Sequence, residues 1–161
     1  NEEKIKRKDQ TKAPESIVFE IAKAKALSQA STNTEEIIIG SDQILVCDGK
    51  IISKAKSKDE ARKKFQKLNN KMHILISAIC IIKKRECIWK KISCAEVFLK
   101  KMTTKMINKY LDENLENALE CVGGYKIEDD SMQLLSIHKG SLEDIQGFPI
   151  SEFITLYKKR R

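Results

Sequence analysis

The chain of 161 residues is long enough to bury a hydrophobic core without disulfides, and its length is typical of one domain. A hydrophobic fraction of 41%, including 5 Phe, 3 Tyr and 1 Trp, excludes an intrinsically disordered chain. The formal net charge of +8 favours an anionic partner, but it does not distinguish a nucleic acid, a nucleotide and a membrane surface.

The cysteines indicate a reducing compartment. They are five in number, form no Cys-x-x-Cys pair and lie mostly in apolar runs, which argues against a structural zinc site. The longest apolar run, Ile74 to Ile82, is interrupted by Ser77 and is far shorter than the roughly 20 residues that a membrane-spanning helix needs. We therefore expect a cytoplasmic protein with no transmembrane segment and no signal peptide.

The first predicted element is a helix that begins at Pro14. Proline suits the first helical position because its missing N–H group is not needed there, and Glu15 complements the helix dipole. An apolar face follows, and the helix is expected to end in the polar stretch 31–34. Lys23 and Lys25 on this helix are expected to be exposed, solubilising lysines.

Residues 37–54 contain an acid between two apolar runs. The second run ends in Asp48-Gly49, which predicts a tight reversal between strands. A buried, charged Asp42 would cost the fold several kcal/mol, roughly. Asp42 therefore lies at the mouth of a cleft or binds a cation, as in an active site, or it caps a strand end or accepts backbone hydrogen bonds in a bulge.

The rest of the chain predicts alternating helices and strands with long strands in the middle. In order, these are a helix that starts with the capping-box spacing Ser57 to Glu60 and ends at Asn69-Asn70, strands 73–83 and 87–99, a helix capped by Thr103 or Thr104, a glycine pair entering a strand at 122–128, a strand at 132–138 and a final helix that starts at Gly147-Phe148-Pro149. This order indicates an α/β protein with a mixed sheet.

Several common sites are excluded or disfavoured. The sequence has no Gly-x-x-x-x-Gly-Lys-Ser/Thr phosphate loop and no Gly-x-Ser-x-Gly elbow. His73 and His138, the only histidines, have no partner at helical spacing and fit strand positions better than metal-ligand positions.

Several motifs agree with one family in order and spacing. They are Ile21-Ala22-Lys23-Ala24-Lys25-Ala26, Gly40-Ser41-Asp42-Gln43, Asp48-Gly49 with Lys54, Glu60-Ala61 with Leu68, Gly124-Tyr125-x-Ile127-Glu128, Gly140 and Gly147-Phe148-Pro149. This set, which covers nearly the whole chain, resembles the Maf family of nucleoside triphosphate pyrophosphatases, also called septum-formation inhibitors.

The resemblance implies a fold like that of inosine triphosphate pyrophosphatases. This is an α/β fold with an elongated mixed β-sheet, flanking helices and a central cleft between two lobes, and it is often paired as a homodimer. We expect residues 1–161 to form a single Maf-like domain that is N-terminally truncated relative to the family, because the family's opening strand and Ser-x-x-Arg phosphate loop would precede the position of Asn1.

The resemblance also implies an activity. The family cleaves a nucleoside triphosphate between the α and β phosphates and uses a divalent metal cation, Mg²⁺ or Mn²⁺. By this likeness Asp42 is the catalytic proton acceptor, and Asp42 and Glu2 hold the metal, although Asn1 replaces the Asp of the family's Asp-Glu pair. Lys54 faces the phosphates, a role that suits a cation near a polyphosphate.

In the family pattern, two further positions set base selectivity. Gln43 and Glu128 stand there, in the form that resembles the branch preferring 7-methylguanosine triphosphate. A carboxylate accepts hydrogen bonds from the N1–H and N2–H donors of guanine, and it favours the positive charge that methylation at N7 adds.

Two alternatives remain open. A basic nucleic-acid-binding module would bind without metal and lose affinity steeply with salt, but the aromatic residues are scattered and form no stacking platform, so nucleic acid is not the expected partner. A catalytically impaired Maf-like protein would keep the fold and bind a partner.

Overall fold

The computed structural model describes residues 12–30, 35–127 and 133–159. These residues form two compact units. Unit 1 comprises the described residues within 1–43, 76–93 and 143–161, and unit 2 comprises those within 44–75 and 94–142. The prediction of a single domain, and that of a cleft between two lobes, stay predictions.

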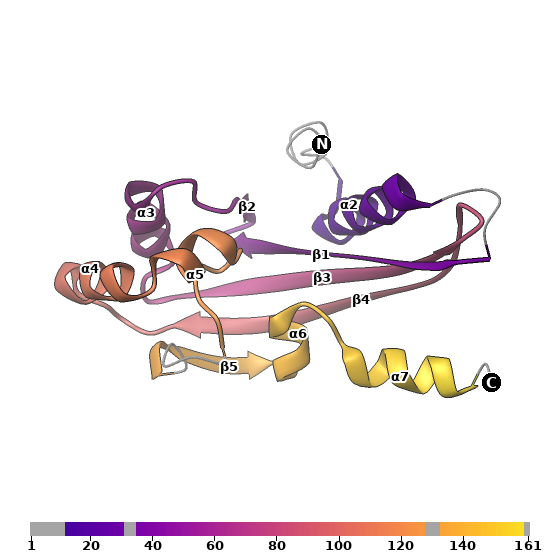
Figure 1. Cartoon of the computed structure of the whole chain (residues 1–161). Coiled ribbons are helices and arrows are strands. Elements are labelled where there is room, and N and C mark those ends of the chain that lie inside the picture. Colours follow the sequence, from indigo (N-terminus) through magenta and orange to yellow (C-terminus); the bar gives the residue numbers. More distant parts are fainter. Residues whose placement is uncertain (1–11, 31–34, 128–132, 160–161) are drawn as a thin grey trace. The chain divides into compact units, whose positions relative to one another are not determined.

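A five-stranded sheet is the framework of the described residues, in the order β2-β1-β3-β4-β5 (Figure 1). Its strands are β1 (Ile37–Cys47), β2 (Lys50–Ile52), β3 (Lys71–Lys83), β4 (Glu86–Leu99) and β5 (Leu135–Lys139). The pairs β1–β2 and β4–β5 are antiparallel, where we expected a mixed sheet. For β1 and β2 the reason is the two-residue turn between them, which joins strands only in the antiparallel sense. The predicted α/β class, with helices flanking a sheet, is confirmed.

Two hairpins use the same kind of turn. Asp48 and Gly49 have φ angles of 50° and 71°, and Lys84 and Arg85 have φ angles of 49° and 66°. Two successive positive φ values match the twist of the flanking strands and are typical of a type I′ turn. The predicted reversal at Asp48-Gly49 is confirmed, and the second turn has the same form without a glycine.

In unit 1, helix α2 (Pro14–Gln29) packs closely on β1. A Cβ atom on Gly40 would lie 2.2 Å from the carbonyl oxygen of Ala22 and 2.7 Å from the Cβ atom of Ala26. Only a glycine permits this approach. Unit 1 also contains α6 (Leu142–Gln146), except for its first residue, and α7 (Ile150–Lys159), whose Glu152 pairs with Lys91 of β4 at 2.7 Å.

In unit 2, α3 (Lys58–Leu68), α4 (Thr104–Glu113) and α5 (Leu115–Glu120) lie together. The predicted caps are confirmed, because Ser57 Oγ accepts a hydrogen bond from the backbone N–H of Glu60 and Thr103 Oγ1 accepts one from that of Met106. The rings of Phe65 and Tyr110 pack with their centroids 5.1 Å apart and anchor α3 to α4.

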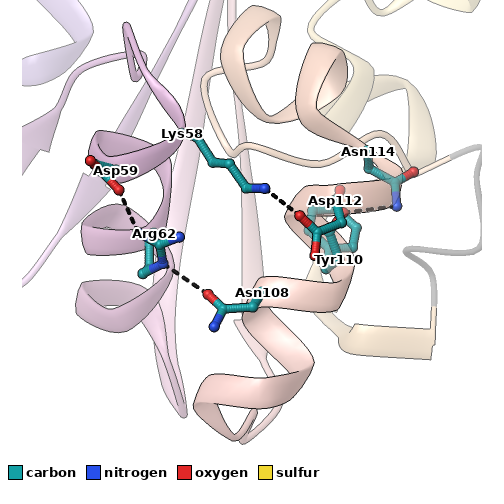
Figure 2. A network of polar contacts seen from close by, with 7 residues as sticks. All are labelled: Lys58, Asp59, Arg62, Asn108, Tyr110, Asp112 and Asn114. Carbon is teal, nitrogen blue, oxygen red and sulfur yellow. Dashed lines mark hydrogen bonds and ion pairs between the residues drawn. The ribbon is translucent and has the colours of Figure 1, made fainter.

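A polar network joins the outer parts of α3 and α4 (Figure 2). Lys58 pairs with Asp112, and Arg62 binds both Asp59 and the side-chain oxygen of Asn108. Exposed pairs of this kind contribute about 0–1 kcal/mol each. Their importance here is that they neutralise the cations on this face of α3.

One predicted strand is wrong. Residues 122–125 form bends and 126–127 form no strand, because Gly124 has a φ angle of 81° and the ring of Tyr125 lies over Gly123 at a distance that a Cβ atom could not tolerate. Tyr125 instead contacts His73 of β3, with its hydroxyl 2.5 Å from Nε2. The strand predicted at 132–138 is present as β5.

Candidate active site

Asp42 lies in β1 with one carboxylate oxygen bound and the other open. Lys25 Nζ donates a hydrogen bond to Asp42 Oδ1 at 2.6 Å. The side chain of Asp42 is 8% exposed, and its Oδ2 is buried without a hydrogen-bond partner among the residues that the structure describes. A buried carboxylate oxygen without a partner carries a desolvation cost that a metal ion, a proton or a ligand donor would offset.

The packing of α2 on β1 places Lys25 beside Asp42. Ala22 and Ala26 are one helical turn apart and meet Gly40, which brings the helix close enough for Lys25 to reach the strand. Lys25 is exposed, as we expected, but it also pairs with Asp42 and so has a role beyond solubility. The small residues at 22, 26 and 40 are the sequence signal that could have indicated this close contact.

Gln43 is held by segments far along the chain. Its Nε2 donates to Ser77 Oγ at 2.9 Å, to the carbonyl oxygen of Ile145 at 2.9 Å and to that of Asp144 at 3.1 Å. The amide nitrogen is therefore fully engaged in fixing β1 against β3 and α6, and the side-chain oxygen is the atom that remains for a ligand.

The neighbouring Gly147 explains part of the Gly-Phe-Pro motif. Gly147 has a φ angle of 89°, and a Cβ atom there would lie 3.2 Å from Gln43 Nε2. Its carbonyl oxygen accepts a hydrogen bond from Ser41 Oγ at 3.2 Å. The motif thus closes the turn after α6 against Ser41 and Gln43, the two residues on either side of Asp42.

The structure does not test the roles of the other predicted site residues. Lys54 is exposed in unit 2, where it lines a pocket of about 440 Å³. Glu2 and Glu128 lie outside the described residues. The structure therefore brings together Asp42, Lys25 and Gln43, while the roles expected for Lys54, Glu2 and Glu128 stay predictions.

The described residues fit a magnesium-type ion only through Asp42. They contain no cluster of three or more His, Cys, Asp or Glu side chains that could hold a metal. However, Mg²⁺ is commonly bound by one or two carboxylates together with water and substrate phosphates. The open Oδ2 of Asp42 is suitable as one such ligand.

Comparison with known proteins gives a consistent result. The family described as Maf, Maf-like protein, matches residues 1–160. A 7-methyl-GTP pyrophosphatase from Bdellovibrio bacteriovorus is 33% identical over 91% of this chain and 76% of its own. A nucleoside triphosphate pyrophosphatase from Pelagibacter ubique is 32% identical over 90% of this chain and 76% of its own. Another, from Ruegeria sp. (strain TM1040), is 28% identical over 88% of this chain and 71% of its own. These matches confirm the resemblance that the motifs indicated.

In the described part of the chain, no helix has both the length and the apolar character needed to cross a bilayer.

Proposed function

The chain belongs to the Maf family of Maf-like proteins, and on this premise we propose that it is a nucleoside triphosphate pyrophosphatase, a hydrolase acting on acid anhydrides. It would cleave the bond between the α and β phosphates and release a nucleoside monophosphate and pyrophosphate. The observation that carries this proposal concerns Asp42: Lys25 binds one carboxylate oxygen, and the other is buried with no hydrogen-bond partner in the described part of the chain.

In the proposed reaction Asp42 acts as a general base. Its Oδ2 accepts a proton from a water molecule, the water oxygen forms a bond to the α phosphorus, and the bond from that phosphorus to the bridging oxygen breaks. The electron pair of the broken bond leaves with pyrophosphate. Lys25 holds the carboxylate in one orientation through Oδ1, so that Oδ2 faces the reactant.

The proposed cofactor is a divalent cation, Mg²⁺ or Mn²⁺. When bound it would neutralise charge on the phosphates. Asp42 is a suitable ligand, since each carboxylate oxygen offers about two acceptor positions. Glu2 is the second ligand that the family resemblance implies.

The proposed substrate class includes modified nucleotides such as 7-methyl-GTP, in a housekeeping role for the nucleotide pool. The names of the relatives support both the general activity and this branch. The structure limits the role of Gln43, because only its side-chain oxygen remains to contact a base. Glu128 would be the carboxylate that reads the donor edge of guanine.

The test is a survey of reaction products. The protein is incubated with each common nucleoside triphosphate and with 7-methyl-GTP, in the presence of Mg²⁺ or Mn²⁺, and nucleotide and phosphate products are separated by chromatography. The proposal expects monophosphate and pyrophosphate in equal amounts. Diphosphate with inorganic phosphate, or no turnover of any nucleotide, would contradict it, and binding without turnover would instead support the catalytically impaired protein.

Two further parts of the proposal concern the cellular compartment and the oligomeric state. None of the five cysteines forms a disulfide bond, which supports a reducing compartment such as the cytoplasm. The homodimer implied by the family resemblance is tested by light scattering over a range of protein concentrations.

A further inference from the structure

A pocket of about 440 Å³ lies in unit 2 between the segment 52–55 and one face of α3. Four side chains of α3 line it, at positions 60, 63, 64 and 67. The spacings of three, four and seven residues place all four on the same face of the helix. Three of them are lysines, and Lys54 from the opposite wall adds a fourth.

The cationic side chains on the two faces of α3 differ in whether they form ion pairs. Lys58 and Arg62, which face α4, are paired with Asp112 and Asp59 (Figure 2). Over residues 12–30, 35–127 and 133–159, no carboxylate forms an ion pair with the pocket lysines 54, 63, 64 or 67. The fold neutralises the outer face and leaves the pocket face positive.

The one acid in the pocket is already engaged. Glu60 Oε2 accepts a hydrogen bond from the backbone N–H of Lys56 at 2.8 Å, while the backbone N–H of Glu60 bonds Ser57. This is the kind of exchange that stabilises a helix start. Glu60 therefore serves the cap of α3 and offsets only part of the charge of four lysines.

Lys64 carries the strongest indication of a ligand. It is 5% exposed, and Val122 is the acceptor that the described structure provides, with its carbonyl oxygen 3.1 Å from Nζ. An ammonium group has three donors, so the buried charge is incompletely satisfied. Burial, together with the nearby charge of Lys54, lowers the pKa of Lys64 to about 8. An anion in the pocket would satisfy the remaining donors.

We propose that this pocket binds a diphosphate group, either as free pyrophosphate or as the terminal phosphates of a nucleotide, through Lys54, Lys63, Lys64 and Lys67. Its concave form suits a small ligand, and four lysines in its lining suit a group with several negative charges. The choice of a diphosphate among anions rests on the proposed function, but the binding itself requires no catalysis.

Calorimetric titration of the whole chain tests the proposal, with inorganic pyrophosphate as the probe. The variants are Lys64→Met, which keeps the length of the side chain, and the double variant Lys63→Gln with Lys67→Gln. Each is expected to weaken pyrophosphate binding by about tenfold or more, since a charge-assisted hydrogen bond is lost. The control is Lys101→Gln with Lys105→Gln, which removes the same charge from exposed positions outside the pocket and is expected to change the affinity by less than about twofold.

Proton linkage gives a readout that a structural role would not change. At pH 8, binding of an anion beside Lys64 draws a proton onto the amine, so the binding heat depends on the ionisation enthalpy of the buffer. This dependence is expected to disappear in Lys64→Met. If affinity falls equally in the control, or if both α3 variants bind pyrophosphate as tightly as the unmodified chain, the proposal is wrong.

Two further titrations identify the source of the diphosphate and separate this inference from the proposed function. A nucleoside triphosphate with a methylene group between its α and β phosphorus atoms cannot be cleaved there. If the α3 variants weaken the binding of this analogue and of pyrophosphate alike, the pocket holds substrate phosphates. If they weaken the binding of pyrophosphate alone, the pocket holds the product. Loss of binding in the variants supports the pocket even where no nucleotide is turned over, and turnover with unchanged binding refutes the pocket alone.

Discussion

Lys25 Nζ lies 2.6 Å from Asp42 Oδ1, and this contact joins helix α2 to strand β1. The pair is asymmetric, because the lysine side chain is 41% exposed and that of the aspartate is 8% exposed. The exposed partner thus orients the buried one and leaves Asp42 Oδ2 without a hydrogen-bond partner among the described residues.

Replacement of Lys25 by Met is expected to reduce pyrophosphate release by about 100-fold or more, because the carboxylate loses its orienting cation. The fold should persist, since the lysine side chain is not buried. The measurement is kcat/KM, with Lys23→Met on the same helix as the control. Equal activity in the two variants would show that the contact with Asp42 has no role.

Replacement of Gly40 by Ala is expected to destabilise the protein by roughly 3 kcal/mol or more, because the new Cβ would lie 2.2 Å from a backbone carbonyl oxygen that cannot move easily. Gly49→Ala is the matched control. At Gly49 nothing lies within 4 Å, so only the positive φ of 71° opposes the change, at a cost of about 1 kcal/mol. Urea unfolding measures both, and similar values would contradict the close packing of α2 on β1.

The turn at Lys84 and Arg85 offers a stabilising change. Both residues have positive φ, which Asn and Gly adopt more readily than Lys and Arg. The double replacement Lys84→Asn with Arg85→Gly is therefore expected to stabilise the hairpin by about 1 kcal/mol, less the contact of Arg85 with the carbonyl oxygen of Ala30 at 2.8 Å and the exposed ion pair of Lys84 with Glu35. A lower unfolding midpoint in urea would contradict the assignment of the turn.

Lys64 gives a pH dependence with a defined sign. Its pKa is about 8 in the folded protein and 10.5 for an ordinary lysine, so the unfolded chain binds the proton more tightly between these values. Stability therefore rises with pH from about 8 to 10.5 through this group. Lys64→Met is expected to remove this rise and to stabilise the protein at pH 7 by about 2 kcal/mol, which is the relieved burial cost less the lost hydrogen bond to Val122.

The control for this experiment is Lys67→Met. Lys67 lies on the same face of α3 but is exposed, so its replacement should leave the dependence of stability on pH unchanged. A rise with pH that persists in Lys64→Met would assign it to another group.

The local elements were predictable because their signals are short in range. The Asp48-Gly49 turn and the cap at Ser57 depend on neighbouring residues, and both were found as predicted. The bend at 122–125 was missed because it depends on Tyr125 reaching His73, which is far away in the sequence. Local pattern contains no information about such a contact.

The candidate site was also predictable only in part. Asp42 was identifiable because a carboxylate between apolar runs needs an explanation. Lys25 was not, because one lysine among 31 Lys and Arg residues is distinguished only by the packing of Ala22 and Ala26 against Gly40. The engagement of Gln43 by the carbonyl groups of Asp144 and Ile145 likewise depends on tertiary structure.

The central claim is that the open oxygen of Asp42 accepts the proton of the attacking water. The most direct measurement is single-turnover pyrophosphate release by Asp42→Asn, alongside urea unfolding of the same sample. We expect release to fall by about 1,000-fold or more while the fold remains intact, since an amide keeps the shape but cannot take the proton. Turnover within about tenfold of the unmodified protein would remove Asp42 from the mechanism.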